Sequence, residues 1–113
     1  MDLLEAIRSH CLAKEGVTEE LPFGPETLVF KVEGKMFALV PLDTDQLSLT
    51  VKNTPEKNEE LRAEYDQVVP GYHTNKKHWN TIHLDGRISA REWMEWLDES
   101  YQLVLPPKRR QNK

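Results

Sequence analysis

Hydrophobic and polar residues alternate with a period of two in the middle third of the chain. Apolar side chains occupy every second position over residues 28–32 and again over 47–51, a pattern typical of strands with one buried face. A mostly apolar run, 35–40, lies between them and follows the pair Glu33-Gly34, an acidic-Gly signal for a two-residue hairpin turn. These segments predict an antiparallel meander with one buried and one partly exposed face.

Another strand is predicted over residues 79–84, before Asp85-Gly86 turns the chain. In this segment Asn80, Ile82 and Leu84 alternate with Trp79, Thr81 and His83. The segment 17–25 contains two prolines and a glycine around Phe23. That composition predicts an ordered loop, pinned by Phe23 and without regular structure. Residues 68–71 are expected only to turn the chain.

Three segments have helical spacing. The first runs from an N-cap at Asp2 to about residue 15 and ends at Gly16. The second starts at Thr54-Pro55 and lies on the surface, held to the core only by residues 61 and 65. The third opens with the capping box Ser89-x-x-Glu92 and ends before Pro106-Pro107. Its apolar stripe comprises Trp93, Trp96, Leu97, Tyr101 and Val104. On the first helix, Cys11 is expected to be buried and His10 to be solvated.

Length and composition favour one small domain. The 113 residues suffice for a single core, which we place at residues 1–105, and residues 106–113 form a basic tail expected to be disordered. The net charge is −4, and the four basic residues of the tail leave 11 basic against 19 acidic residues before it, or −8. An acidic body excludes non-specific wrapping of a polyanion, so any contact with nucleic acid must be a local patch.

Cellular context can also be predicted. A single cysteine forms no intrachain disulfide, and the first residues lack the basic and apolar regions of a signal peptide. No apolar run approaches the ~20 residues that cross a bilayer. We therefore expect a cytoplasmic, monomeric protein without a membrane contact.

The densest chemistry lies in residues 70–82, Pro-Gly-Tyr-His-Thr-Asn-Lys-Lys-His-Trp-Asn-Thr-Ile. Imidazoles, ammonium groups, amides and aromatic faces gathered in one run are typical of a surface that holds an anion or a nucleobase. The alternative is architectural: Tyr72 and Trp79 would anchor the loop, and burial of Asn75, His73 and Asn80 would support that interpretation.

Catalytic and metal chemistry are not favoured. His73, His78 and His83 recur every five residues, but an odd spacing on extended chain alternates faces, so no shared ligand geometry follows. The serines lack a strained Gly-x-Ser-x-Gly turn, and phosphate-binding glycine loops are absent. We expect no enzyme activity, no metal and no cofactor.

The run 70–82, together with 16–19, 22–24 and 30–38, strongly resembles the MmcQ/YjbR family of small bacterial proteins. The match extends from the first helix to the last and leaves out the tail. One departure is Thr74, where the family pattern usually has methionine.

The resemblance implies an α+β fold of the CyaY/frataxin type, an antiparallel sheet with helices packed on one face. It also implies DNA binding through a "double wing" arrangement like that of a phage transcription-factor domain. The iron binding of frataxins is not implied here, because the acidic ridge of their first helix is reduced to Asp2, Glu5 and Glu15. The motif positions that match this chain are Lys31, Lys35, Tyr72, His73, Asn75, Lys76, Lys77, His78 and Trp79.

We therefore predict binding of double-stranded DNA by the exposed sheet face and the central loop. Lysines would contact phosphates while Asn75 and the aromatic side chains read or stack on bases. The alternative is a non-catalytic module that binds a small anionic ligand or a protein partner in a pocket formed by the same residues. A closed pocket beside Tyr72 and Trp79 would favour that alternative, and a broad basic ridge would favour DNA.

Overall fold

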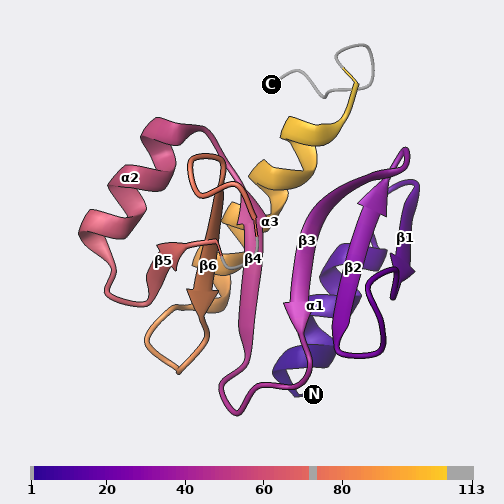
Figure 1. Cartoon of the computed structure of the whole chain (residues 1–113), viewed down its shortest axis with the longest axis horizontal. Helices are drawn as coiled ribbons and strands as arrows, with labels where there is room; N and C mark the ends of the chain where they lie inside the picture. The colour runs from indigo at the N-terminus through magenta and orange to yellow at the C-terminus, as the bar shows by residue number, and fades with distance from the viewer. Residues whose placement is uncertain (1, 72–73, 107–113) are drawn as a thin grey trace.

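The structure is a computed structural model and describes residues 2–71 and 74–106. Six antiparallel strands form one sheet, with α1 and α3 across one face and α2 beside β5 at the edge (Figure 1). The predicted α+β class, with helices packed on one face of an antiparallel sheet, is confirmed. The helices are α1 (Leu3–Leu12), α2 (Pro55–Glu64) and α3 (Ala90–Val104), and the strands are β1 (Val17–Glu20), β2 (Thr27–Val32), β3 (Lys35–Pro41), β4 (Ser48–Lys52), β5 (Val68–Pro70) and β6 (Trp79–His83).

The strand order is β1-β2-β3-β4-β6-β5. The predicted hairpin joins β2 to β3, and both of its turn residues have positive φ, 54° at Glu33 and 79° at Gly34. Positive φ at both positions is what a two-residue type I′ turn requires. A β-bulge lies next to Phe30 and places Phe37 and Ala38, neighbours in sequence, in the same core.

The core lies between the sheet and the pair α1 and α3. All five residues of the predicted α3 stripe are buried, and Ser89 and Glu92 form the predicted capping box. On α1, Cys11 is 0% exposed, as predicted. Burial raises the pKa of its thiol to about 12, because the thiolate would lose its hydration.

Three predictions for the first twenty-five residues are wrong. Residues 17–20 are not loop but strand β1, which pairs along its whole length with β2. Phe23 does not pin a loop, since it is 63% exposed. His10 is not simply solvated, because its Nε2 lies 2.7 Å from Oδ1 of Asp98 on α3.

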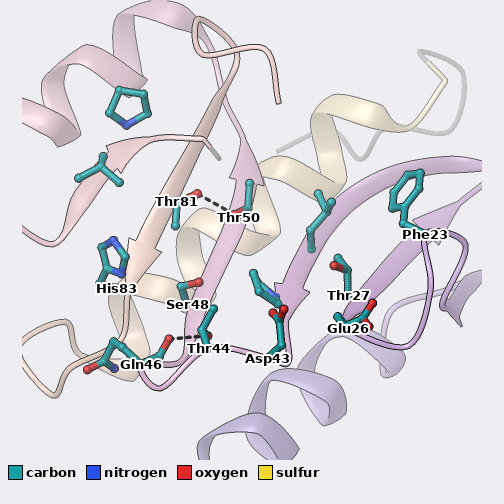
Figure 2. A pocket seen from close by; sticks show the side chains of 14 residues that line it. Phe23, Glu26, Thr27, Asp43, Thr44, Gln46, Ser48, Thr50, Thr81 and His83 are labelled. Atoms are coloured by element: carbon teal, nitrogen blue, oxygen red, sulfur yellow. Dashed lines mark hydrogen bonds between the residues drawn. The ribbon is translucent and has the colours of Figure 1, made fainter. Parts of the chain in front are cut away.

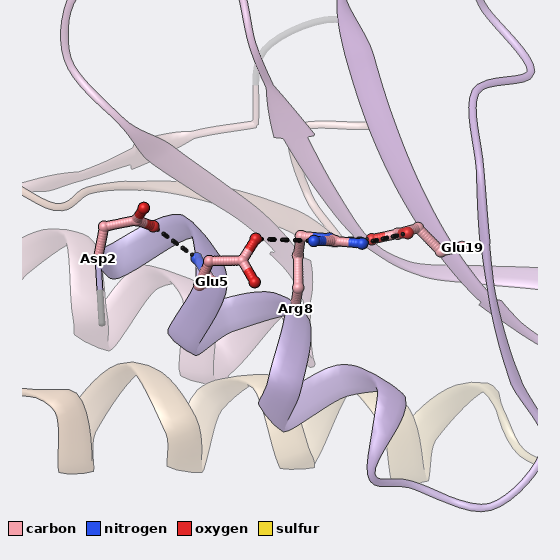
Figure 3. A network of polar contacts seen from close by, with 4 residues as sticks. All are labelled: Asp2, Glu5, Arg8 and Glu19. Atoms are coloured by element: carbon pink, nitrogen blue, oxygen red, sulfur yellow. Dashed lines mark hydrogen bonds and ion pairs between the residues drawn. The ribbon is translucent and has the colours of Figure 1, made fainter.

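A guanidinium explains how so acidic a segment can form a strand. Arg8 of α1 donates to Glu5 over 2.7 Å and, through a second nitrogen, to Glu19 of β1 over 2.9 Å (Figure 3). Glu5 itself donates its backbone N–H to the side chain of Asp2, the N-cap of α1. The ion pair therefore ties β1 to the first helix and offsets the charge of Glu19.

The strand β5 was also not predicted. Its three residues pair with β6, from Val68 opposite Ile82 to Pro70 opposite Asn80. Proline is tolerated here because β5 is the last strand of the sheet, so no further strand needs its missing N–H. No helix within the described ranges is both long and apolar enough to span a bilayer.

Candidate nucleic-acid interface

Residues 74–78 form the described part of the loop between β5 and β6, while Tyr72 and His73 lie outside the described residues. Asn75 organises a tight turn: its backbone carbonyl accepts from the N–H of His78 (3.2 Å) and of Trp79 (3.0 Å). Its side-chain oxygen accepts from the N–H of Lys77 over 2.9 Å. Asn75 is exposed, so its side-chain NH2 group points to no described acceptor and can meet a partner from outside.

Two residues of α2 hold this loop in place. Asn58, 1% exposed, donates through Nδ2 to the carbonyl of Lys77 (3.0 Å). Arg62 donates to the carbonyl of Lys76 and, over 2.7 Å, to the side-chain oxygen of Asn80. Asn80 is also 1% exposed and donates back to the carbonyl of Asn58 over 3.2 Å. The described part of the loop is therefore attached to α2 through Lys76 and Lys77, and β6 through Asn80.

Sequence reasoning missed Asn58 and Arg62, which it left on a polar helix surface. The available signal was positional: Asn58, Leu61 and Tyr65 stand at i, i+3 and i+7 and so share the face that meets the sheet. The buried Asn80 supports the architectural interpretation for part of the motif, since its side chain bonds only within the protein. The exposed Asn75 does not support it.

The predicted lysines fall into three groups. Lys76 and Lys77 are exposed on the loop, although Lys76 Nζ donates to the carbonyl of Gly71 over 3.0 Å. Lys35 is exposed at the start of β3, next to the hairpin turn. Lys31 lies on the exposed sheet face as predicted, but its Nζ is 3.3 Å from Oε1 of Glu20. A carboxylate therefore already neutralises Lys31.

The strand register adds a cation that the sequence prediction omitted. Lys52 ends β4 directly opposite Trp79, the first residue of β6. Both side chains are half-buried. Lys52 therefore lies at the base of the loop that carries Lys76 and Lys77.

The β2–β3 hairpin and the β5–β6 loop lie at the same end of the sheet (Figure 1). This follows from the antiparallel order, because β2 ends where β3 and β6 begin. Three strand spacings separate β2 from β6, and β3 pairs with β4 only at Ala38 with Val51 and Leu39 with Thr50. We call this edge, with Lys35, Lys52, Lys76 and Lys77, the basic end. Its four lysines form no ion pair with any residue in the described ranges.

His78 and His83, the two histidines of the series that the structure describes, do not converge. His78 is half-buried in the loop, where its carbonyl accepts from the N–H of Asn53 (2.9 Å), while His83 lies at the far end of β6. Within residues 2–71 and 74–106, no three His, Cys, Asp or Glu side chains are grouped to hold a metal ion.

A pocket does exist, but it lies elsewhere. A cavity of about 810 Å³ opens on the sheet face opposite α1 and α3, among residues of β2 to β6 and the adjoining loops (Figure 2). None of the described residues predicted to form the site lines it. Its charged lining residues are the carboxylates Glu26 and Asp43. The pocket therefore has no cationic side chain in its lining and does not fit the anionic ligand of the alternative prediction.

Comparison with known proteins places the chain among relatives of similar length. A family model described as YjbR matches residues 12–103. The protein named "Uncharacterized protein YjbR" of Escherichia coli K12 is 31% identical over 110 residues, which cover 95% of this chain and 93% of that protein. YbdF of Escherichia coli O157:H7, also named uncharacterized, is 36% identical over 84 residues, or 74% of this chain and 69% of that protein.

Solved structures share the fold over nearly the whole chain. The crystal structure of a Deinococcus radiodurans protein with the domain DUF419 superposes with a TM-score of 0.88 at 42% identity, covering 96% of this chain and 82% of that one. A crystal structure from Pseudomonas syringae gives a TM-score of 0.78 at 26% identity, with 93% and 100% coverage.

Proposed function

The chain belongs to the YjbR family, and from that premise we propose that it binds double-stranded DNA through the basic end of its sheet. The proposal takes the protein as a monomer in the cytoplasm. The hairpin and the loop act as two projections that contact the two phosphate backbones beside one groove, which is the "double wing" arrangement.

One observation carries the proposal: lysines without carboxylate partners gather at two projections on the same edge of a protein whose net charge is −4. The two projections lie at one end of the same sheet, so they can face one duplex together. Phosphates attract ammonium groups without regard to sequence, so these lysines would orient the protein on the duplex. The acidic remainder of the molecule keeps the contact local and weak.

Each residue of the basic end has a distinct part in this arrangement. Lys76 and Lys77 contact one backbone and Lys35 the other, while Lys52 adds charge between them. The free NH2 group of Asn75 can donate at a base edge, because only its oxygen is engaged in the turn. Lys31 contributes little, since Glu20 neutralises it. Asn58 and Arg62 position the loop without touching DNA.

The salt dependence of binding tests the proposal. Each phosphate contact contributes about −0.9 to the slope of log K against log salt concentration. The double variant Lys76→Ala with Lys77→Ala should therefore bind a duplex more weakly and lose about 2 from that slope. Lys35→Ala should lose about 1, and Lys31→Ala less. Fluorescence anisotropy of a labelled duplex between 20 and 100 mM salt gives these slopes.

The matched control removes one cationic side chain at the other end of the molecule. Arg91 is exposed in the first turn of α3 and, like Lys35, forms no ion pair with a residue in the described ranges. That helix begins at the end of the sheet opposite the basic end (Figure 1). Arg91→Ala should leave the slope unchanged, whereas Lys35→Ala should lower it by about 1. Equal slopes for Arg91→Ala and Lys35→Ala, or no duplex binding by the wild type at 20 mM salt, would exclude DNA binding at the basic end.

A further inference from the structure

We propose that the cavity on the exposed sheet face, here called the outer-face pocket, binds a small organic cation with an apolar body. This site is separate from the basic end and does not depend on DNA binding. Its volume of about 810 Å³ falls within the range of pockets that enclose most of a small organic molecule.

The walls of the outer-face pocket are mainly apolar. Leu39 and Pro41 of β3 line one side, and Val69 and Pro70 of β5 line the other. Phe23, in the β1–β2 loop, closes the rim (Figure 2). Phe23 is 63% exposed, so the ring has apolar surface left to cover. Such walls favour a ligand with an aromatic or aliphatic body, because binding removes both surfaces from water.

Hydroxyl groups line the floor between these walls. Thr50 and Thr81 hydrogen-bond to each other over 2.8 Å across β4 and β6 (Figure 2). Ser48, next along β4 on the same face, stands directly opposite His83. It is 5% exposed, and its hydroxyl forms no hydrogen bond with any residue that the structure describes. Because Ser48 lines the pocket, its hydroxyl is available to hydrogen-bond a molecule that binds there.

The charge of the lining selects the class of ligand. The titratable residues that line the outer-face pocket are Glu26, Asp43 and His83, with no lysine or arginine. Glu26 and Asp43 come from neighbouring loops joined by the hydrogen bond from Leu42 N–H to the Glu26 carbonyl (2.7 Å). Neither carboxylate has an ion-pair partner among the described residues. A protonated amine fits this side of the pocket and a carboxylate or phosphate does not.

Three indole compounds that differ only in their polar end group separate charge from shape. Tryptamine is a cation, tryptophol is neutral and indole-3-propionate is an anion. In ¹H–¹⁵N correlation spectra of the full chain, tryptamine should shift the amides of Ser48, Thr50, Thr81 and His83. Its Kd should be at least tenfold below that of indole-3-propionate, with tryptophol between them.

Two variants assign this preference to the carboxylates. Glu26→Gln with Asp43→Asn should raise the Kd of tryptamine about tenfold and leave that of tryptophol unchanged. Asp45→Asn is the control, because Asp45 is exposed in the same turn as Asp43 but does not line the pocket. Ser48→Ala should weaken both tryptamine and tryptophol about threefold, since the lost hydroxyl serves both.

Several results would overturn the proposal. These are the absence of shifts at the four floor residues with every compound, equal affinity for the anion, or an unchanged tryptamine Kd in the Gln/Asn variant. Shifts of the same amides on raising protein concentration alone would assign the pocket to a second copy of the chain instead. The Lys76→Ala, Lys77→Ala variant should still bind tryptamine, so failure at one site leaves the other testable.

Discussion

Replacing Asn58 with alanine tests whether a buried amide on α2 holds the β5–β6 loop. Asn58 donates to the carbonyls of Lys77 (3.0 Å) and Asn53 (3.3 Å). Each lost hydrogen bond costs about 1 kcal/mol, and a carbonyl left buried without a donor costs about 1–3 kcal/mol more. The higher helix propensity of alanine returns about 0.6 kcal/mol. The net loss is about 2–4 kcal/mol in the free energy of unfolding.

That loss is large enough to measure and small enough to leave the protein folded. A chain of 113 residues unfolds with an entropy of roughly 0.24 kcal/mol per kelvin, so Tm should fall by about 8–17 °C. Urea unfolding followed by tryptophan fluorescence gives the midpoint and the slope m. We expect a lower midpoint and an unchanged m, which indicates lost stability without a change in the surface exposed on unfolding.

Two further variants make the result specific. Glu60→Ala, at an exposed position of the same helix, should change stability by no more than about 0.5 kcal/mol. Asn58→Asp keeps the side-chain volume but replaces the donor by an acceptor and buries a carboxylate, so it should cost at least as much as Asn58→Ala. If the midpoints of Asn58→Ala and Glu60→Ala coincide, the amide does not hold the loop.

Three other predictions follow from the contacts of single residues. Gly71→Ala should cost about 1–3 kcal/mol, seen as a lower Tm, because the added Cβ would lie 2.8 Å from the Cβ of Trp79. Burial raises the pKa of the Cys11 thiol to about 12 in the folded protein. Cys11 should therefore resist alkylation by iodoacetamide at pH 8 until urea unfolds the protein. The free energy of unfolding should also fall from about pH 9 towards pH 12, because over that range the thiol ionises only in the unfolded chain. Hydrogen bonds from Arg8 lower the pKa of the Glu19 carboxyl in the folded protein. Glu19→Gln should therefore lower the urea midpoint at pH 7. The difference in midpoint from wild type should shrink as pH falls below about 4.5, where the carboxyl becomes protonated.

Each of these has a clear contrary outcome. A Gly71→Ala protein that melts within 2 °C of wild type would mean that the loop yields to the added methyl group. Alkylation of Cys11 at equal rates in buffer and in urea would show that the thiol is accessible in the folded state. A Glu19→Gln effect that is the same at pH 7 and pH 3 would assign its cost to something other than the ion pair with Arg8.

The elements predicted correctly are those whose signals are local. The alternation of β2 and β4, the Glu33-Gly34 turn and the Ser89 capping box each depend on residues within a few positions of one another. Strands β1 and β5 were missed because each has three or four residues and lies at a sheet edge. Such strands are stabilised by pairing with their neighbour strand and, for β1, by Arg8 on α1. These partners are distant in sequence, so the pattern of residues within the strand itself does not reveal them.

The candidate sites were less predictable than the fold, for a similar reason. Sequence reasoning chose the polar groups of residues 70–82, but Asn80 proved to be buried and structural. It omitted Lys52, whose place beside Trp79 depends on the pairing of β4 with β6. The outer-face pocket gives no signal in any one segment, because its lining comes from strands β2 to β6 and from loops far apart in sequence.

Both proposed sites depend on one feature, the register between β4 and β6. Leu49, Val51 and Ile82 are buried in the core and fix that register from the helix-covered face. Side chains alternate along a strand, so the same register places the intervening residues opposite one another on the other face. The pairs on that face are Lys52 with Trp79, Thr50 with Thr81 and Ser48 with His83. The first pair belongs to the basic end, and the other two lie on the floor of the outer-face pocket. A slip of one residue would turn Lys52 and Ser48 towards the core, so the hydrophobic packing that stabilises the fold also positions both surfaces.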